Sequence, residues 1–234
     1  MRNKKAIILL FITTIVSGLA QGISMIAIPW YFVEIVERPN VFATAYIIIT
    51  FLTLFWGLYA GTLIDRYSRK TIFILINLFC GIFIGLISLY GYYNEFLSDF
   101  FVIFVFFITI FNYNIHYPNL YAFGQEITEK KYYGKLNSYI EVQGQVTSVF
   151  AGAFAAILLT GVSDNNLSIG GINIHIPFNI EAWKIYEIFL MDAFTYLIVL
   201  FLLSFISYTS IENQQKDIDN LIVRFKQGLS YLKN

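Results

Sequence analysis

The sequence predicts an all-helical (all-α) membrane protein with six transmembrane helices. Its 234 residues are 58% hydrophobic and only 13% charged, which is more apolar surface than a water-soluble domain of this size buries. The chain also contains six apolar runs that are long enough to span a bilayer. Its basic residues gather in alternate segments between those runs, as they do in proteins that cross the membrane several times.

The six spans follow from the length of the apolar runs. A helix rises 1.5 Å per residue, so about 20 apolar residues cross roughly 30 Å of hydrocarbon, and a helix satisfies its own backbone there. The first run follows a basic stretch, but its apolar core is too long for a signal peptide and no small-residue cleavage site follows it, so we interpret it as a retained helix. The predicted spans are residues 6–31, 43–64, 71–92, 100–123, 140–161 and 186–208.

The distribution of Lys and Arg predicts the orientation. One side of the membrane carries thirteen basic residues, and the other carries only Arg38 and Lys184. Because cytoplasmic loops are enriched in Lys and Arg, both termini are expected in the cytoplasm. The net charge is zero, which gives no case for a nucleic-acid partner. The thirteen residues are Arg2, Lys4, Lys5, Arg66, Arg69, Lys70, Lys130, Lys131, Lys135, Lys216, Arg224, Lys226 and Lys233.

Two polar segments lie outside the spans. Residues 162–184 are long and glycine-bearing, and their alternating apolar residues predict a small hairpin that turns at Gly170 and Gly171, with the role of a lid or spacer. Apolar residues recur at helical spacing after residue 217, which predicts an amphipathic helix along the cytoplasmic membrane surface. We therefore expect a six-helix bundle over residues 1–210 and a cytoplasmic linker with an amphipathic helix over residues 211–234.

Polar residues within the spans mark faces that avoid lipid, where polar groups are costly. The first and the fourth spans each carry such residues on one stripe, and three tyrosines form a neighbouring stripe on the fourth. The stripes indicate either hydrogen bonding between helices or a cavity that substrate can enter. The cavity candidates are Ser17, Gln21, Ser24, Asn112, His116 and Asn119, and the tyrosines are Tyr113, Tyr117 and Tyr121.

Small residues predict how the helices pack. Glycines four residues apart occur at 18 and 22, at 57 and 61, and at 81 and 85, and such pairs let helix backbones approach closely.

No motif in the chain points to an enzyme. The sequence has no G-x-S-x-G, no H-E-x-x-H and no glycine-rich phosphate loop. Its single cysteine, Cys80, lies in an apolar run and cannot form an intramolecular disulfide or a zinc site by itself. We expect no catalytic residue, no metal and no cofactor.

The segment between the second and third spans carries the most specific motif. Residues 61–70 read GTLIDRYSRK, which resembles the cytoplasmic loop motif of the major facilitator superfamily, G-x-L-x-D-R-x-G-R-[RK]. Six of its seven defined positions match, and Ser68 stands where glycine is usual. Serine is less suited than glycine to a left-handed turn. The matching positions are Gly61, Leu63, Asp65, Arg66, Arg69 and Lys70, and the gating residues predicted among them are Gly61, Asp65, Arg66, Arg69 and Lys70.

The resemblance covers essentially the whole chain and implies its fold and partners. It implies one half of a major facilitator fold, namely a six-helix bundle of two inverted three-helix repeats with the first and fourth helices lining a central cavity. It also implies alternating access against a second six-helix half, either a missing C-terminal half or another copy. The partners are then a small-molecule substrate, the lipid bilayer and that second half. Asp65 and its neighbouring cations would clasp the cytoplasmic helix ends in one conformation.

A second stretch narrows the resemblance. Residues 188–197 look like the corresponding segment of the bacterial and archaeal drug-exporter branch that includes macrolide efflux proteins. This implies efflux of a small organic molecule across the cell membrane of a prokaryote. Ala151 and Gly152, however, occupy the place where Gly-Pro is expected in antiporters of the superfamily.

Two carboxylates are candidates for proton coupling. Asp192 lies about two turns into the sixth span, where a charge needs a partner, and its alternative role is a structural hydrogen bond. Glu34 lies just beyond the first span, where a solvated interfacial carboxylate is the alternative. Glu141 is interpreted as a solvated residue at the start of the fifth helix. The other function classes are a non-transporting subunit or truncated remnant, and, more remotely, a membrane enzyme.

Overall fold

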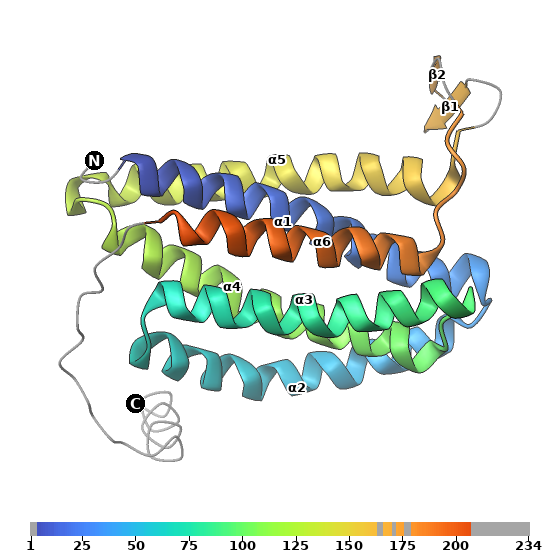
Figure 1. Ribbon diagram of the computed structural model, residues 1–234, viewed down its shortest axis with the longest axis horizontal. Helices are drawn as coiled ribbons and strands as arrows, with labels where there is room; N and C mark the ends of the chain where they lie inside the picture. The colour runs from blue at the N-terminus through green and yellow to red at the C-terminus, as the bar shows by residue number, and fades with distance from the viewer. Residues whose placement is uncertain (1–3, 163–165, 170–171, 176–178, 207–234) are drawn as a thin grey trace, which may run out of the picture.

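In the part of the chain that the computed structural model describes, six long helices alternate in direction (Figure 1). The structure describes residues 4–162, 166–169, 172–175 and 179–206. All six helices are long and apolar enough to cross a membrane, which confirms the six predicted spans. The predicted amphipathic helix after residue 211 lies outside the described residues. The helices are α1 (Lys4–Trp30), α2 (Pro39–Arg66), α3 (Arg69–Asn94), α4 (Asp99–Glu126), α5 (Tyr133–Thr160) and α6 (Ile185–Ser204), with a π-helical turn η1 at Tyr31–Ile35 and a 3-10 turn η2 at Lys130–Tyr132.

Several helices extend past their apolar runs. Helix α2 begins at Pro39, and Pro suits this first position because its missing N–H would have no helical partner there. Helix α5 begins at Tyr133, before the predicted 140, and its first two turns are largely polar. Helical hydrogen bonding does not require an apolar side chain, so hydropathy places the hydrocarbon part of a helix but not its ends.

The first three helices and the last three make the same pattern of contacts. Helix α1 packs against α5 and α6, while α4 packs against α2 and α3, and α3 and α6 form a further extensive pair. Swapping the first three helices for the last three therefore maps the main contacts onto themselves. Because α1 and α4 run in opposite directions (Figure 1), the two three-helix units are inverted repeats.

Close packing uses two of the predicted glycine pairs. A Cβ built on Gly22 would lie 2.7 Å from Cβ of Ala151 on α5, and one built on Gly81 would lie 3.0 Å from Cβ of Tyr196 on α6. The α1–α5 and α3–α6 crossings thus depend on small residues. Gly57 and Gly61 on α2 differ, since a Cβ at either position would have no described atom within 4 Å.

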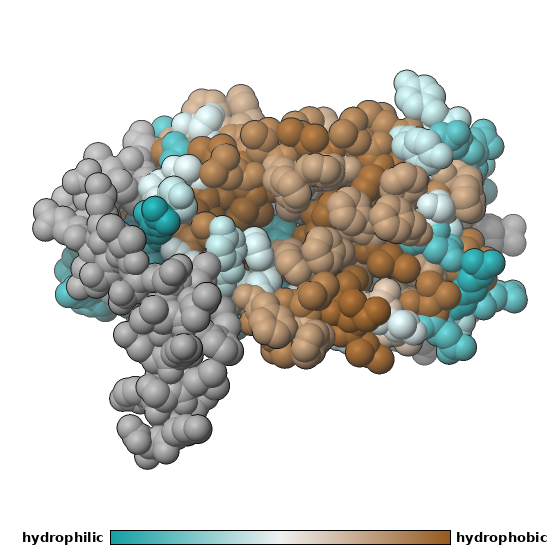
Figure 2. All heavy atoms as spheres, turned by 90° about the horizontal axis from the view of Figure 1, so that it is seen from below, coloured by the Kyte–Doolittle hydropathy of each residue, from teal (hydrophilic) through white to brown (hydrophobic). Residues whose placement is uncertain are grey.

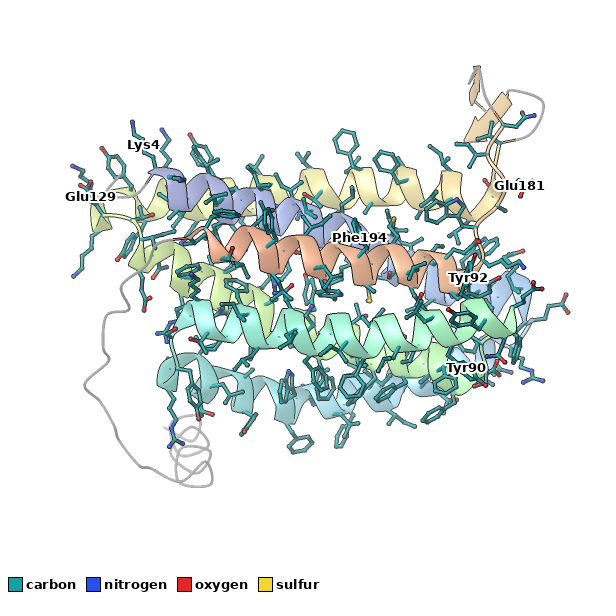
Figure 3. The ribbon with its side chains drawn as sticks, viewed as in Figure 1. Lys4, Tyr90, Tyr92, Glu129, Glu181 and Phe194 are labelled. Atoms are coloured by element: carbon teal, nitrogen blue, oxygen red, sulfur yellow. The ribbon has the colours of Figure 1, made fainter. Side chains whose placement is uncertain are left out.

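The ends of the bundle are polar and its middle is apolar, as one face shows in Figure 2. We call the end that holds Lys4 and Glu129 the basic end, and Glu181 and Tyr92 lie at the opposite end (Figure 3). At that opposite end, strands β1 (Asn166–Ile169) and β2 (Ile172–His175) pair antiparallel, with Ile169 opposite Ile172. This pairing confirms the predicted hairpin.

Candidate functional site

The first turn of α3 ties three helices together at the basic end. Nε of Arg69 lies 3.5 Å from Oε1 of Glu126, at the end of α4, and both side chains are nearly buried. Nζ of Lys70 donates a hydrogen bond of 2.8 Å to the carbonyl of Ile206, just after α6. A cation near the last carbonyls of a helix is electrostatically favourable. Arg69 and Lys70 therefore hold α3 to α4 and to α6.

Ser68 begins α3 as its N-cap. Its hydroxyl accepts a hydrogen bond of 3.2 Å from the backbone N–H of Thr71, and its backbone is extended, with φ −64° and ψ 136°. Serine is among the preferred residues at such a position. Residue 68 does not adopt the left-handed conformation that favours glycine, so serine fits this turn without strain.

The remaining motif residues lie at the surface. Gly61, Asp65 and Arg66 are exposed, and the Arg66 guanidinium lies 5.9 Å from the ring centroid of Tyr67. A Cβ on Gly61 would meet open space. The structure thus brings the motif to one corner at the ends of α2, α3 and α4, and the gating role of Gly61, Asp65, Arg66, Arg69 and Lys70 stays a prediction.

The polar stripe of α1 faces the interior of the bundle. Gln21 donates to the Thr109 carbonyl on α4 at 3.3 Å, and Ser24 donates to Asp192 on α6 at 3.1 Å. Thr14 donates to Oε1 of Gln143 on α5 at 3.2 Å. The stripe therefore connects α1 with three other helices. Its members Thr14, Ser17, Gln21 and Ser24 are all buried.

The polar stripe of α4 is also buried. Asn112 donates to the Tyr196 hydroxyl on α6 at 3.3 Å, and Asn119 donates to the Arg69 carbonyl at 2.9 Å. The His116 ring packs edge-on against Phe73, with the centroids 5.1 Å apart. Five of the six predicted cavity residues thus form interhelical contacts, and Ser17 is buried beside them. The role of all six in substrate binding stays a prediction.

Ser17 and His116 meet at a small internal cavity of about 10 Å³ between α1, α3, α4 and α6. Asn77 of α3 also lines it. This volume is near the minimum for one water molecule. The cavity is too small for an organic substrate.

The tyrosines of α4 lie on a different face, which is open. Tyr113 is 51% exposed, and its ring centroid lies 4.6 Å from that of Tyr117. The Tyr121 hydroxyl donates a hydrogen bond to Oε1 of Glu141 on α5. Glu141 is exposed, and the sequence did not indicate this pairing. The available signal was the recurrence of polar residues on α5 at positions 138, 141, 145 and 148, which are all exposed.

Comparison with known protein families agrees with this architecture. The sequence model of the Major Facilitator Superfamily matches residues 10–229. The chain belongs to this superfamily. Searches of curated proteins and of solved structures gave no significant match. Members of the major facilitator superfamily are membrane transporters, so the six helices form a bundle of a transporter fold, equivalent to one half of the superfamily's fold.

The two predicted coupling carboxylates occupy very different places in this major facilitator bundle. Asp192 is fully buried, and while its Oδ2 accepts the hydrogen bond from Ser24, its Oδ1 has no hydrogen-bond partner among the described residues. Glu34 is exposed in η1 at the end opposite the basic end. Within the described residues, no group of three or more His, Cys, Asp or Glu side chains is placed to hold a metal.

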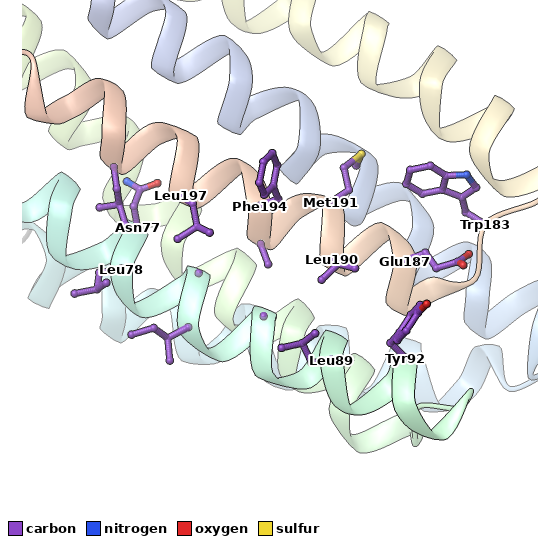
Figure 4. Close-up of a pocket in the computed structure, with 15 residues that line it drawn as sticks. Asn77, Leu78, Leu89, Tyr92, Trp183, Glu187, Leu190, Met191, Phe194 and Leu197 are labelled. Atoms are coloured by element: carbon purple, nitrogen blue, oxygen red, sulfur yellow. The ribbon is translucent and has the colours of Figure 1, made fainter.

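A groove of about 840 Å³ lies between α3 and α6 (Figure 4). Gly81 and Gly85 line it together with Leu89, Leu190 and Phe194. Trp183 and Glu187 lie at one end of the groove in the same view. The sequence predicted the small residues of α3 as a packing surface but did not predict this groove, because the width between two helices depends on their crossing.

Proposed function

We propose that this major facilitator chain is part of a secondary active transporter that expels a small organic molecule by alternating access. In this proposal the chain acts as the N-terminal half and supplies one of the two bundles that move around a shared site. Both termini lie in the cytoplasm of a prokaryotic cell, as the excess of Lys and Arg at the basic end favours.

One observation carries the proposal: the bundle has a polar face at membrane depth. Glu141 lies at the start of the apolar part of α5, which the sequence places at residues 140–161, and exposed Gln145 and Ser148 continue the same strip toward the middle of the helix, about 6 and 10 Å further along at 1.5 Å per residue. Exposed polar side chains on a helix that crosses hydrocarbon are costly where they face lipid. The face of α4 and α5 that carries Glu141, Gln145 and Ser148 therefore suits a water-filled path or a second bundle.

The corner at the basic end has the properties of a gate. Arg69 and Lys70 hold α3 to the ends of α4 and α6, while Asp65 and Arg66 are exposed beside them. We propose that Gly61, Asp65 and Arg66 complete the clasp across the second bundle in one conformation. Gly61 suits that role because its exposed surface allows a close helix approach.

Proton coupling is proposed to use Asp192. It is buried between α1 and α6, with one carboxylate oxygen lacking a partner among the described residues, and intramembrane carboxylates often belong to proton relays. In that case Asp192→Asn should abolish uphill efflux and preserve downhill exchange. The same two assays on Glu34→Gln test Glu34, the second candidate for coupling. Equal loss of both activities would assign Asp192 a structural role.

Efflux assays with dyes test the proposed function. A covalent tandem of two copies, expressed in energised cells without other exporters, should lower the accumulation of at least one dye from a panel of cationic, neutral and anionic dyes. The single copy, reconstituted as a demonstrated monomer, should show no saturable flux, because one bundle supplies one wall. Unchanged accumulation of every dye by a folded tandem, and by the chain joined to a second half, would contradict transport.

A further inference from the structure

We propose that Tyr113, Tyr117, Tyr121 and Glu141 form a binding site for an organic cation. The inference rests on the proposed transport function and deepens it by naming the charge class of the substrate. We call these four residues the tyrosine–glutamate site.

The four residues form one continuous strip. The tyrosines recur every four residues on α4, so they stack along one side of that helix. A Cβ built on Gly144 of α5 would lie 3.8 Å from the Tyr117 hydroxyl, so Tyr117 extends over a helix position without a side chain. The strip ends at Glu141, which accepts the hydrogen bond from Tyr121.

The charge at this site is not balanced within the described chain. Among the described residues, no basic side chain forms an ion pair with Glu141. Lys135 on the same helix lies elsewhere, with its Nζ 5.5 Å from the ring centroid of Tyr139. Covering this exposed face with a second bundle would remove the carboxylate from bulk water, which is unfavourable without a counter-charge, and a bound cation would supply that charge.

The tyrosine rings add a second attraction for the same ligand. The faces of aromatic rings attract cations within about 6 Å, and the interaction strengthens when water is excluded. Tyr113 is exposed, which leaves ring surface on the open side of α4, and the ring of Tyr117 lies next to it, tilted by 47°. Aromatic faces beside a carboxylate favour an organic cation over an anion of the same size.

The alternative role is purely structural, with Tyr121 and Glu141 pinning α4 to α5. The two roles respond differently to substitution. Glu141→Gln keeps an acceptor for the Tyr121 hydroxyl and removes only the charge, whereas Tyr121→Phe removes the hydrogen bond and keeps the ring. A pinning role is damaged by Tyr121→Phe, and a cation site is damaged by Glu141→Gln.

Binding of tetraphenylphosphonium to the chain in lipid nanodiscs tests the proposal, with uncharged triphenylphosphine oxide as the comparison. Glu141→Gln should weaken tetraphenylphosphonium binding about tenfold or more, Tyr117→Ala about fivefold, and Tyr121→Phe less than either. Glu181→Gln, which removes one exposed carboxylate at the opposite end, should leave binding unchanged. Affinity for triphenylphosphine oxide should be the same with and without Glu141.

Equal tetraphenylphosphonium affinity in the wild-type chain and Glu141→Gln, or no saturable binding to folded protein, would overturn the cation site. Circular dichroism of each variant establishes that it is folded. Efflux of neutral or anionic dyes by the tandem would then leave the transport proposal standing. Conversely, binding that depends on Glu141 without any dye efflux would retain the site and remove transport.

Discussion

The α3–α6 face and the α4–α5 face are both exposed, yet they are built from different residues. Mid-helix, the exposed large side chains of α3 and α6 are apolar, among them Phe79, Leu86 and Phe194. The α4–α5 face exposes Tyr113, Glu141, Gln145 and Ser148. Exposure of a face of the bundle therefore does not by itself tell whether lipid, water or another bundle contacts that face. The chemistry of the exposed side chains does, because lipid excludes charge and water does not.

The largest expected effect comes from placing the same charge on each face. Phe194 lies near the middle of α6 (Figure 3), so Phe194→Lys should cost about 2.5–3.5 kcal/mol of membrane insertion if it faces lipid. Gln145→Lys, near the middle of α5, should insert normally. The measurement is the membrane-inserted fraction of each variant. Similar insertion of the two variants would remove the contrast between the faces.

A smaller effect is expected for glycines on packed and open surfaces. Gly22→Ala places a Cβ 2.7 Å from that of Ala151, so it should destabilise the bundle by about 1–3 kcal/mol through overpacking. Gly57→Ala meets open space and should stabilise α2 by up to about 1 kcal/mol. Unfolding titrations in mixed micelles measure both changes. Equal destabilisation would indicate that the open face of α2 is packed in the folded chain.

The smallest effect extends the comparison to the ends of the bundle. Arg69→Gln removes the nearly buried pair with Glu126 and should cost about 1–2 kcal/mol, less than the roughly 3–5 kcal/mol of a fully buried pair. Arg38→Gln removes a shorter but exposed contact of 2.9 Å with Asp99 and should cost less than about 0.5 kcal/mol. The same unfolding titrations measure both changes. A larger loss of stability for Arg38→Gln than for Arg69→Gln would contradict the assignment of Arg69–Glu126 as the stronger ion pair.

The sequence predicted the number of spans, their alternation and the hairpin between α5 and α6, because these depend on hydropathy and local turn signals. It also predicted which residues share a stripe. It could not tell where a stripe points, since the interior of a bundle and an aqueous cavity both shelter polar groups from lipid. Gln21 and Ser24 accordingly bond α4 and α6, whereas Tyr113, one residue after Asn112, is exposed.

The sequence also could not predict which side chains on different helices contact one another. The pairs Arg69–Glu126 and Tyr121–Glu141 join different helices, and only the relative rotation of those helices brings the side chains together. The sequence could have predicted the N-cap at Ser68, because serine before a helix commonly accepts a backbone hydrogen bond. The glycine usual at that position in the family motif instead directed attention to a left-handed turn, which residue 68 does not form.

The most direct test of the account is the environment of the two faces in a bilayer. Spin labels on single cysteines at Gln145 and at Phe194, in a Cys80→Ser background in liposomes, can be relaxed by a water-soluble nickel complex or by oxygen dissolved in lipid. The label at 145 should respond mainly to the nickel complex, and the label at 194 mainly to oxygen. Oxygen-dominated relaxation at 145 would place the Glu141 face against lipid and contradict the account.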